Sequence, residues 1–86
     1  MSISIEQGTF TTNVDNHTLD LDSGLFPHAQ VAPVVVANPQ EPNGNFNVFI
    51  SSLTVVGGSW RVTFGFSGKV GSEDVTVAYR AITRTI

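Results

Sequence analysis

The chain has 86 residues, a formal net charge of −3 and no cysteine. This length predicts one domain over residues 1–86, and the lack of cysteine excludes disulfides and thiolate metal sites. Four basic residues are too few for a nucleic-acid interface, and without an apolar stretch of about 20 residues we expect no membrane span.

The first third of the chain predicts short strands. Residues 2–7 and 9–14 alternate in polarity, and Gly8 between them predicts a bend or a bulge. Residues 17–22 predict a strand with two leucines on the inner face and two aspartates on the outer face. These inward residues are Leu19 and Leu21, and the outward ones are Asp20 and Asp22.

The next segment contains apolar residues in a loop and in a strand. A loop over residues 23–28 is expected to place Leu25 and Phe26 in the core. Within residues 30–37, the run Val34-Val35-Val36 predicts a strand that is covered on both faces, by a second sheet and by something else.

The remaining sequence alternates between turns and strands, with no segment of helical period. Turns are predicted at residues 38–45, 57–58 and 67–73, and strands at residues 46–54, 59–66 and 74–85. The spacing of turns predicts an all-β antiparallel sandwich of six or seven strands. Such a small chain, with 13% charged residues, is expected to gain stability by oligomerisation.

Four polar side chains are candidate ligand-binding residues. Asp20 and Asp22 form a D-x-D pair, which suits a hard cation or a shared proton, although a solvated strand face produces the same pattern. Arg61 and Arg80 point away from the apolar stripes, which suits them to surface or interface contacts.

The sequence gives less support to sugar stacking, metal binding and catalysis. Trp60 and Tyr79 suit sugar stacking, but both are in phase with apolar stripes, which favours packing in the core. No spacing places His17 and His28 in a metal site, and no nucleophile, base and orienting group form a recognisable set. We therefore expect no metal, no cofactor and no enzymatic activity.

Five motifs follow one another in a distinctive order. They are Glu6-Gln7-Gly8-Thr9; Phe26 followed by Ala32-Pro33-Val34-Val35-Val36; Leu53-Thr54; Gly58-Ser59-Trp60-Arg61-Val62; and Val75-Thr76-Val77-Ala78-Tyr79-Arg80-Ala81-Ile82. This order resembles the H-type lectin domain of snail agglutinins and of the C-terminal part of discoidins. The resemblance implies a six-stranded sandwich that forms a trimer or two stacked trimers. It also implies binding of galactose or N-acetylgalactosamine between protomers.

The chain departs from that family at its sugar site. The family often has an arginine early in the central strand, but residues 43–47 contain none, and Ser67-Gly68 stands near the family's Trp-His pair. Two functions therefore remain open, a lectin-like module for carbohydrate recognition or host-surface attachment and a structural module of a phage virion with a protein partner. The N-terminus has no signal-peptide pattern, which leaves the location open between a virion and the cytoplasm.

Overall fold

The computed structural model describes residues 2–27, 31–40, 46–68 and 73–85. In this part of the chain every regular element is a β-strand, and all strand pairs are antiparallel. The strands are β1 (Ser2–Thr12), β2 (Asn16–Asp20), β3 (Val34–Gln40), β4 (Asn47–Val56), β5 (Ser59–Ser67) and β6 (Val75–Thr85).

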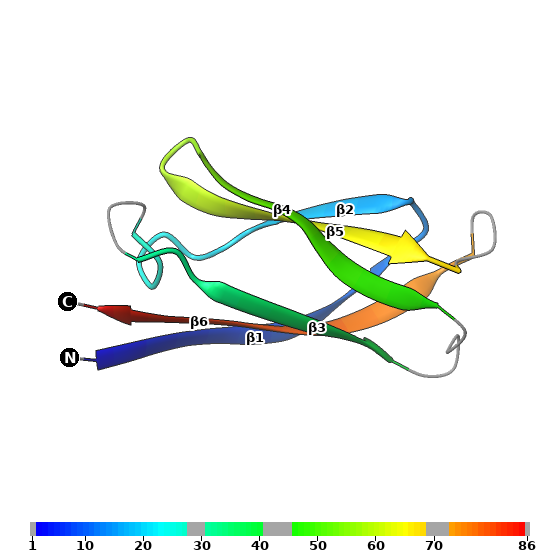
Figure 1. Cartoon of the computed structure of the whole chain (residues 1–86), viewed down its shortest axis with the longest axis horizontal. Helices are drawn as coiled ribbons and strands as arrows, with labels where there is room; N and C mark the ends of the chain where they lie inside the picture. Colours follow the sequence, from blue (N-terminus) through cyan, green and yellow to red (C-terminus); the bar gives the residue numbers. More distant parts are fainter. Residues whose placement is uncertain (1, 28–30, 41–45, 69–72, 86) are drawn as a thin grey trace.

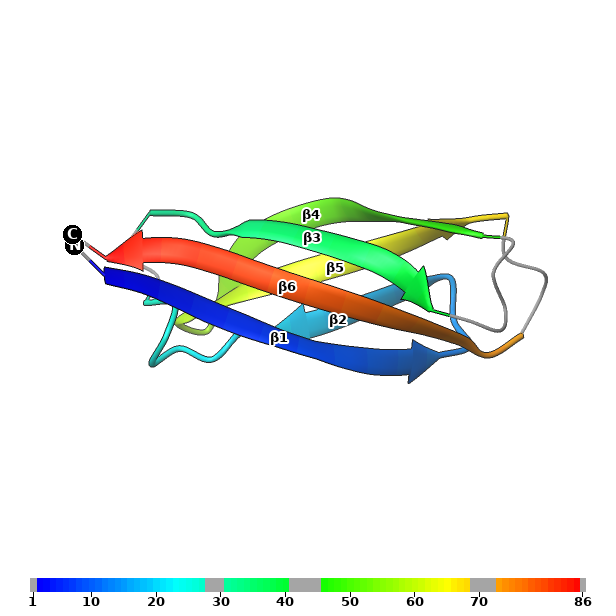
Figure 2. The same ribbon diagram turned by 90° about the horizontal axis from the view of Figure 1, so that it is seen from below.

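The six strands form two sheets of three strands, with the orders β1-β6-β3 and β2-β5-β4. The two sheets face each other in a long, narrow, sandwich-like domain of 42 × 22 × 15 Å (Figure 1). In the view of Figure 2, β6 runs between β1 and β3, and the other sheet lies behind. The expectation of an all-β antiparallel fold is confirmed, and the described part holds six strands.

The core lies between the sheets because alternate residues of each strand point inward. Val62 and Phe64 of β5, together with Val77 and Ala81 of β6, are completely buried. At the end where β1 begins, Phe26 enters the core from the loop after β2, as expected. Leu25 does not, since 37% of its surface is exposed.

Two glycines form the tight turn between β4 and β5. Gly57 and Gly58 have φ angles of 61° and 86°, a region that L side chains rarely adopt. Two successive positive φ angles belong to the hairpin turn whose twist matches that of its strands. The turn predicted here is confirmed, and it sets β4 beside β5.

Gly8 does not interrupt its strand, so the predicted bend or bulge is wrong. β1 pairs with β6 in unbroken register from Ser2 to Thr12. A Cβ at Gly8 would lie 3.4 Å from ring atom Cε1 of Tyr79 and 3.4 Å from its hydroxyl oxygen. The glycine therefore leaves room on the inner face for the Tyr79 ring.

The valine run in β3 is covered on one face only. Val35 packs against the core, whereas Val34 is 67% exposed and Val36 is also exposed. β3 continues through Pro39, beyond the predicted strand end, and pairs there with Val77. The proline is tolerated because β3 is an edge strand.

Candidate functional site

The four predicted site residues lie at three separate places. Asp20 and Arg61 come together on the outer face of the β2-β5-β4 sheet, where β2 and β5 place them opposite each other. Asp22 lies in the loop after β2, and Arg80 lies on the outer face of the β1-β6-β3 sheet. No single cleft therefore joins all four.

Asp20 and Arg61 form a bidentate ion pair. Arg61 Nε donates to Asp20 Oδ1 at 2.7 Å, and Nη2 donates to Oδ2 at 3.2 Å. These hydrogen bonds and the charge of Arg61 lower the pKa of Asp20, and the carboxylate in turn raises the pKa of Arg61. The pair is therefore fully charged at neutral pH and carries no net charge.

Asp22 organises a turn and does not share a strand face with Asp20, so that prediction is wrong. Its Oδ1 accepts a 2.8 Å hydrogen bond from the Gly24 amide, and its carbonyl accepts bonds from Leu25 and Phe26. Its own amide donates to Glu6 Oε1 at 2.8 Å. Aspartates commonly fold the chain back in this way, and the turn brings Phe26 to the core.

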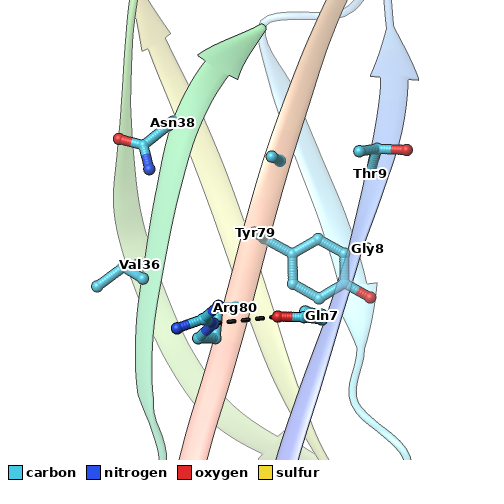
Figure 3. Close-up of a pocket in the computed structure, with 8 residues that line it drawn as sticks. Gln7, Gly8, Thr9, Val36, Asn38, Tyr79 and Arg80 are labelled. Atoms are coloured by element: carbon cyan, nitrogen blue, oxygen red, sulfur yellow. Dashed lines mark hydrogen bonds between the residues drawn. The ribbon is translucent and has the colours of Figure 1, made fainter.

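Arg80 borders a shallow depression of about 570 Å³ on the outer face of the β1-β6-β3 sheet (Figure 3). The small side chain of Ala78 stands between Thr9 and Asn38, which leaves the hollow. Arg80 Nε donates to Gln7 Oε1 at 3.1 Å, and this bond fixes the guanidinium at the rim. Guanidinium, amide and hydroxyl groups suit a carboxylate or another polar group of a partner.

Trp60 and Tyr79 both pack against the core, as their phase predicted. The Tyr79 hydroxyl donates to Glu6 Oε2 at 2.9 Å, and burial followed by this bond raises the pKa of Tyr79 to about 12. Within the described residues the buried Nε1 of Trp60 has no hydrogen-bond acceptor. Both residues are half-buried.

Sequence reasoning missed Phe49 as a functional candidate. Phe49 lies on the outer face of the β2-β5-β4 sheet, in register with Gly65 of β5 and, across β5, with Asn16 of β2. Its side chain is 50% exposed. A glycine inside a strand beside an outward-facing phenylalanine was the available signal, because such a glycine often marks a close approach.

The structure supports no metal centre in the ranges that it describes. No group of three or more histidine, cysteine, aspartate or glutamate side chains gathers there. His17 stacks on the Phe10 ring with a centroid distance of 4.1 Å, and burial lowers its pKa. His28 lies outside the described residues.

The same ranges contain no helix that is long and apolar enough to cross a bilayer. No protein-family model, curated protein or solved structure matches this chain. Its class is therefore defined by the fold alone, as a small all-β domain of two three-stranded sheets.

Proposed function

We propose that this chain is a non-catalytic binding module that assembles as a homo-oligomer, a trimer or two stacked trimers. One observation carries the proposal: an apolar patch on the outer face of the β1-β6-β3 sheet. Ile5, Ile82 and Val34 stand side by side in one row across all three strands. The patch consists of Ile3, Ile5, Val34, Val36 and Ile82.

The patch is unusual in its exposure. Ile3 is 66% exposed and Val34 is 67% exposed, and both are β-branched residues that pack well on a pleated surface. Each Å² of apolar surface that a neighbouring copy covers contributes roughly 25 cal/mol to the free energy of association. A contiguous patch of this kind on a small domain typically marks an interaction surface, which supports burial against another copy.

Charge favours a ring over a two-fold dimer. The outer face that carries the patch also carries Arg80 and Arg84. The described carboxylates lie elsewhere, with Glu6 inside, Asp20 on the opposite sheet and the others in loops. A two-fold contact would place this basic face against itself, whereas a ring places it against a different surface of the next copy.

For the ligand, we propose carbohydrate recognition of galactose or N-acetylgalactosamine type, or host-surface attachment. The resemblance in the order of motifs supports this choice. Weak single-site binding would gain about 10²–10⁴-fold in avidity from several linked sites.

A structural role in a phage virion is the second candidate. It is favoured by Asn47 and Ser67 in the stretches where the lectin family has its arginine and its Trp-His pair. In that case the partner is another virion protein, and the module needs no sugar site.

The test is the mass of the purified chain in solution, measured with a glycan array on the same sample. We expect an oligomer that Val34→Glu dissociates and that Thr18→Glu, on the opposite sheet, leaves intact. Binding to galactose-type glycans supports the lectin-like function, and an oligomer that binds no glycan supports the virion role. A wild-type monomer contradicts the proposed assembly, and a monomer that also binds no glycan contradicts both functions.

A further inference from the structure

Phe49 is the one aromatic residue whose side chain is exposed. The chain has eight aromatic residues, and all of them lie within the described ranges. The other seven are buried or half-buried in the sandwich. A half-exposed phenylalanine in the middle of a sheet face leaves an apolar surface uncovered, which calls for a physical reason.

Gly65 determines how the Phe49 ring lies. The two residues are paired across β4 and β5. A Cβ added at Gly65 would lie only 2.6 Å from ring atoms Cε2 and Cζ of Phe49. The end of the ring therefore rests over the Gly65 backbone, in the space that any other side chain would fill. We call the surface made by Phe49, Gly65 and Asn16 the Phe49 platform.

Hydroxyl and amide groups surround this platform. Along β5, the next outward residues on either side of Gly65 are Thr63 and Ser67, and Asn47 pairs with Ser67. Ser51 is also exposed, and its hydroxyl donates to the Thr63 carbonyl at 3.2 Å. These groups both donate and accept hydrogen bonds and carry no charge at neutral pH.

Among the described residues, the charges on this face are balanced. Asp20 and Arg61 lie two outward positions along the strands from Asn16 and Gly65, which corresponds to about 13 Å. Since the two side chains form an ion pair, neither presents an uncompensated charge. This argues against a nucleic-acid strand, whose bases would stack on Phe49 but whose phosphates need unpaired cations.

We propose that the Phe49 platform binds a neutral saccharide, with the apolar C–H face of one sugar ring stacked on Phe49. The proposal deepens the carbohydrate-binding function above and rests on it. Asn16 and Thr63 are placed to hydrogen-bond sugar hydroxyls beside the stacked ring. The Asp20–Arg61 pair supplies a polar end for a second sugar unit, because a carboxylate and a guanidinium together accept and donate such bonds.

The platform lies on the face of the domain opposite the apolar patch. It lies on the outer face of the β2-β5-β4 sheet, whereas the apolar patch lies on the outer face of the β1-β6-β3 sheet (Figure 1). Contact through the apolar patch therefore leaves the platform of the same copy uncovered. This site is formed within one chain and does not depend on a cleft between protomers.

The test is an amide-resolved NMR titration of the native protein with N-acetylgalactosamine and lactose. We expect saturable shifts at Asn16, Phe49, Thr63 and Gly65. Phe49→Ala should weaken binding about tenfold, and Phe49→Tyr should bind within about twofold of the wild type. Val56→Ala is the matched control, because it removes exposed apolar surface from the same strand and face without touching the platform.

Gly65→Ala is a second variant that keeps the aromatic ring. The added methyl group displaces the Phe49 ring from its seat, so binding should weaken although the ring is retained. Thermal unfolding of each variant shows that it is folded. Unchanged affinity in folded Phe49→Ala overturns the platform and leaves the lectin-like function standing. No saturable shift in the wild type overturns both the platform and the proposed sugar ligand, and the solution mass still reports separately on assembly.

Discussion

The Tyr79 hydroxyl donates a 2.9 Å hydrogen bond to Glu6 Oε2, across 73 residues of sequence. The other oxygen of the same carboxylate accepts the Asp22 amide at 2.8 Å. Glu6 therefore connects β1, β6 and the loop that carries Phe26 into the core. The bond from the Asp22 amide links the β1-β6-β3 sheet to the loop that follows β2.

Removing the ring or the hydroxyl of Tyr79 should destabilise the fold to different extents. Tyr79→Phe leaves one Glu6 oxygen half-buried without its donor and should cost about 1–2 kcal/mol of unfolding free energy. Tyr79→Ala also leaves a cavity against Gly8 and the core and should cost about 3 kcal/mol. Urea unfolding measures both. A loss below about 0.5 kcal/mol for Tyr79→Ala would mean that the ring is not packed as described.

The Tyr79 contact also predicts a pH dependence at the alkaline end. The folded-state pKa is about 12, above the ordinary value of 10.0, so the folded chain holds the phenol proton more tightly than the unfolded chain. The stability that the protonated Tyr79 phenol contributes is fully present below pH 10 and is lost as the pH rises toward 12. Absorbance titration reports it directly because the chain has one tyrosine. Ionisation at the ordinary value in the folded protein would contradict the buried contact.

The Asp20–Arg61 pair predicts that the Asp20 carboxyl titrates at a lower pH than an ordinary aspartate. The folded-state pKa of Asp20 lies below its ordinary value of 3.8, so the pair contributes stability above that pH and loses it as the pH falls. The pKa of Asp20, measured by NMR titration of its carboxyl, should shift back toward 3.8 in Arg61→Gln. The overall stability should change little, because exposed ion pairs contribute little. An unchanged Asp20 titration in that variant would mean that another group lowers this pKa.

His17 predicts a loss of stability under mild acid. Burial lowers its folded-state pKa below 6.5, so the unfolded chain binds the proton more readily. The stability contributed by neutral His17 is present above pH 6.5 and falls as the pH drops through that value. The unfolding midpoint should therefore decrease between pH 7.5 and pH 5.5, and by less in His17→Gln. Equal decreases in both proteins would assign the effect to other groups.

Much of the fold follows from period-two alternation in the sequence. In β5 and β6 this pattern accounts for the complete burial of Val62, Phe64, Val77 and Ala81. The same pattern placed Arg61 on the outer surface. Where alternation stops, the sequence did not separate the adjacent Leu25 and Phe26: both were expected in the core, and only Phe26 is buried. The turn organised by Asp22 makes that choice by turning Phe26 inward.

The arrangement of the candidate sites could not be predicted because it depends on strand order and register. Asp20 meets Arg61 only because β2 pairs with β5, and Arg80 is separated from both because β6 belongs to the other sheet. The alignment of Phe49 with Gly65 also depends on register, which shifts by one residue between Ile50 and Ser52. Gly8 was interpreted as a break because its role lies in a cross-strand contact with Tyr79.

The most direct test of self-association is light scattering of the wild-type chain, the Val34→Glu variant and the Thr18→Glu control. We expect the wild type and Thr18→Glu at about three or six times the 9.2 kDa chain mass. The mass of Val34→Glu should be smaller, because a carboxylate in the apolar patch opposes burial of the patch against another copy. A wild-type mass near 9.2 kDa at the highest concentration would contradict the proposed assembly.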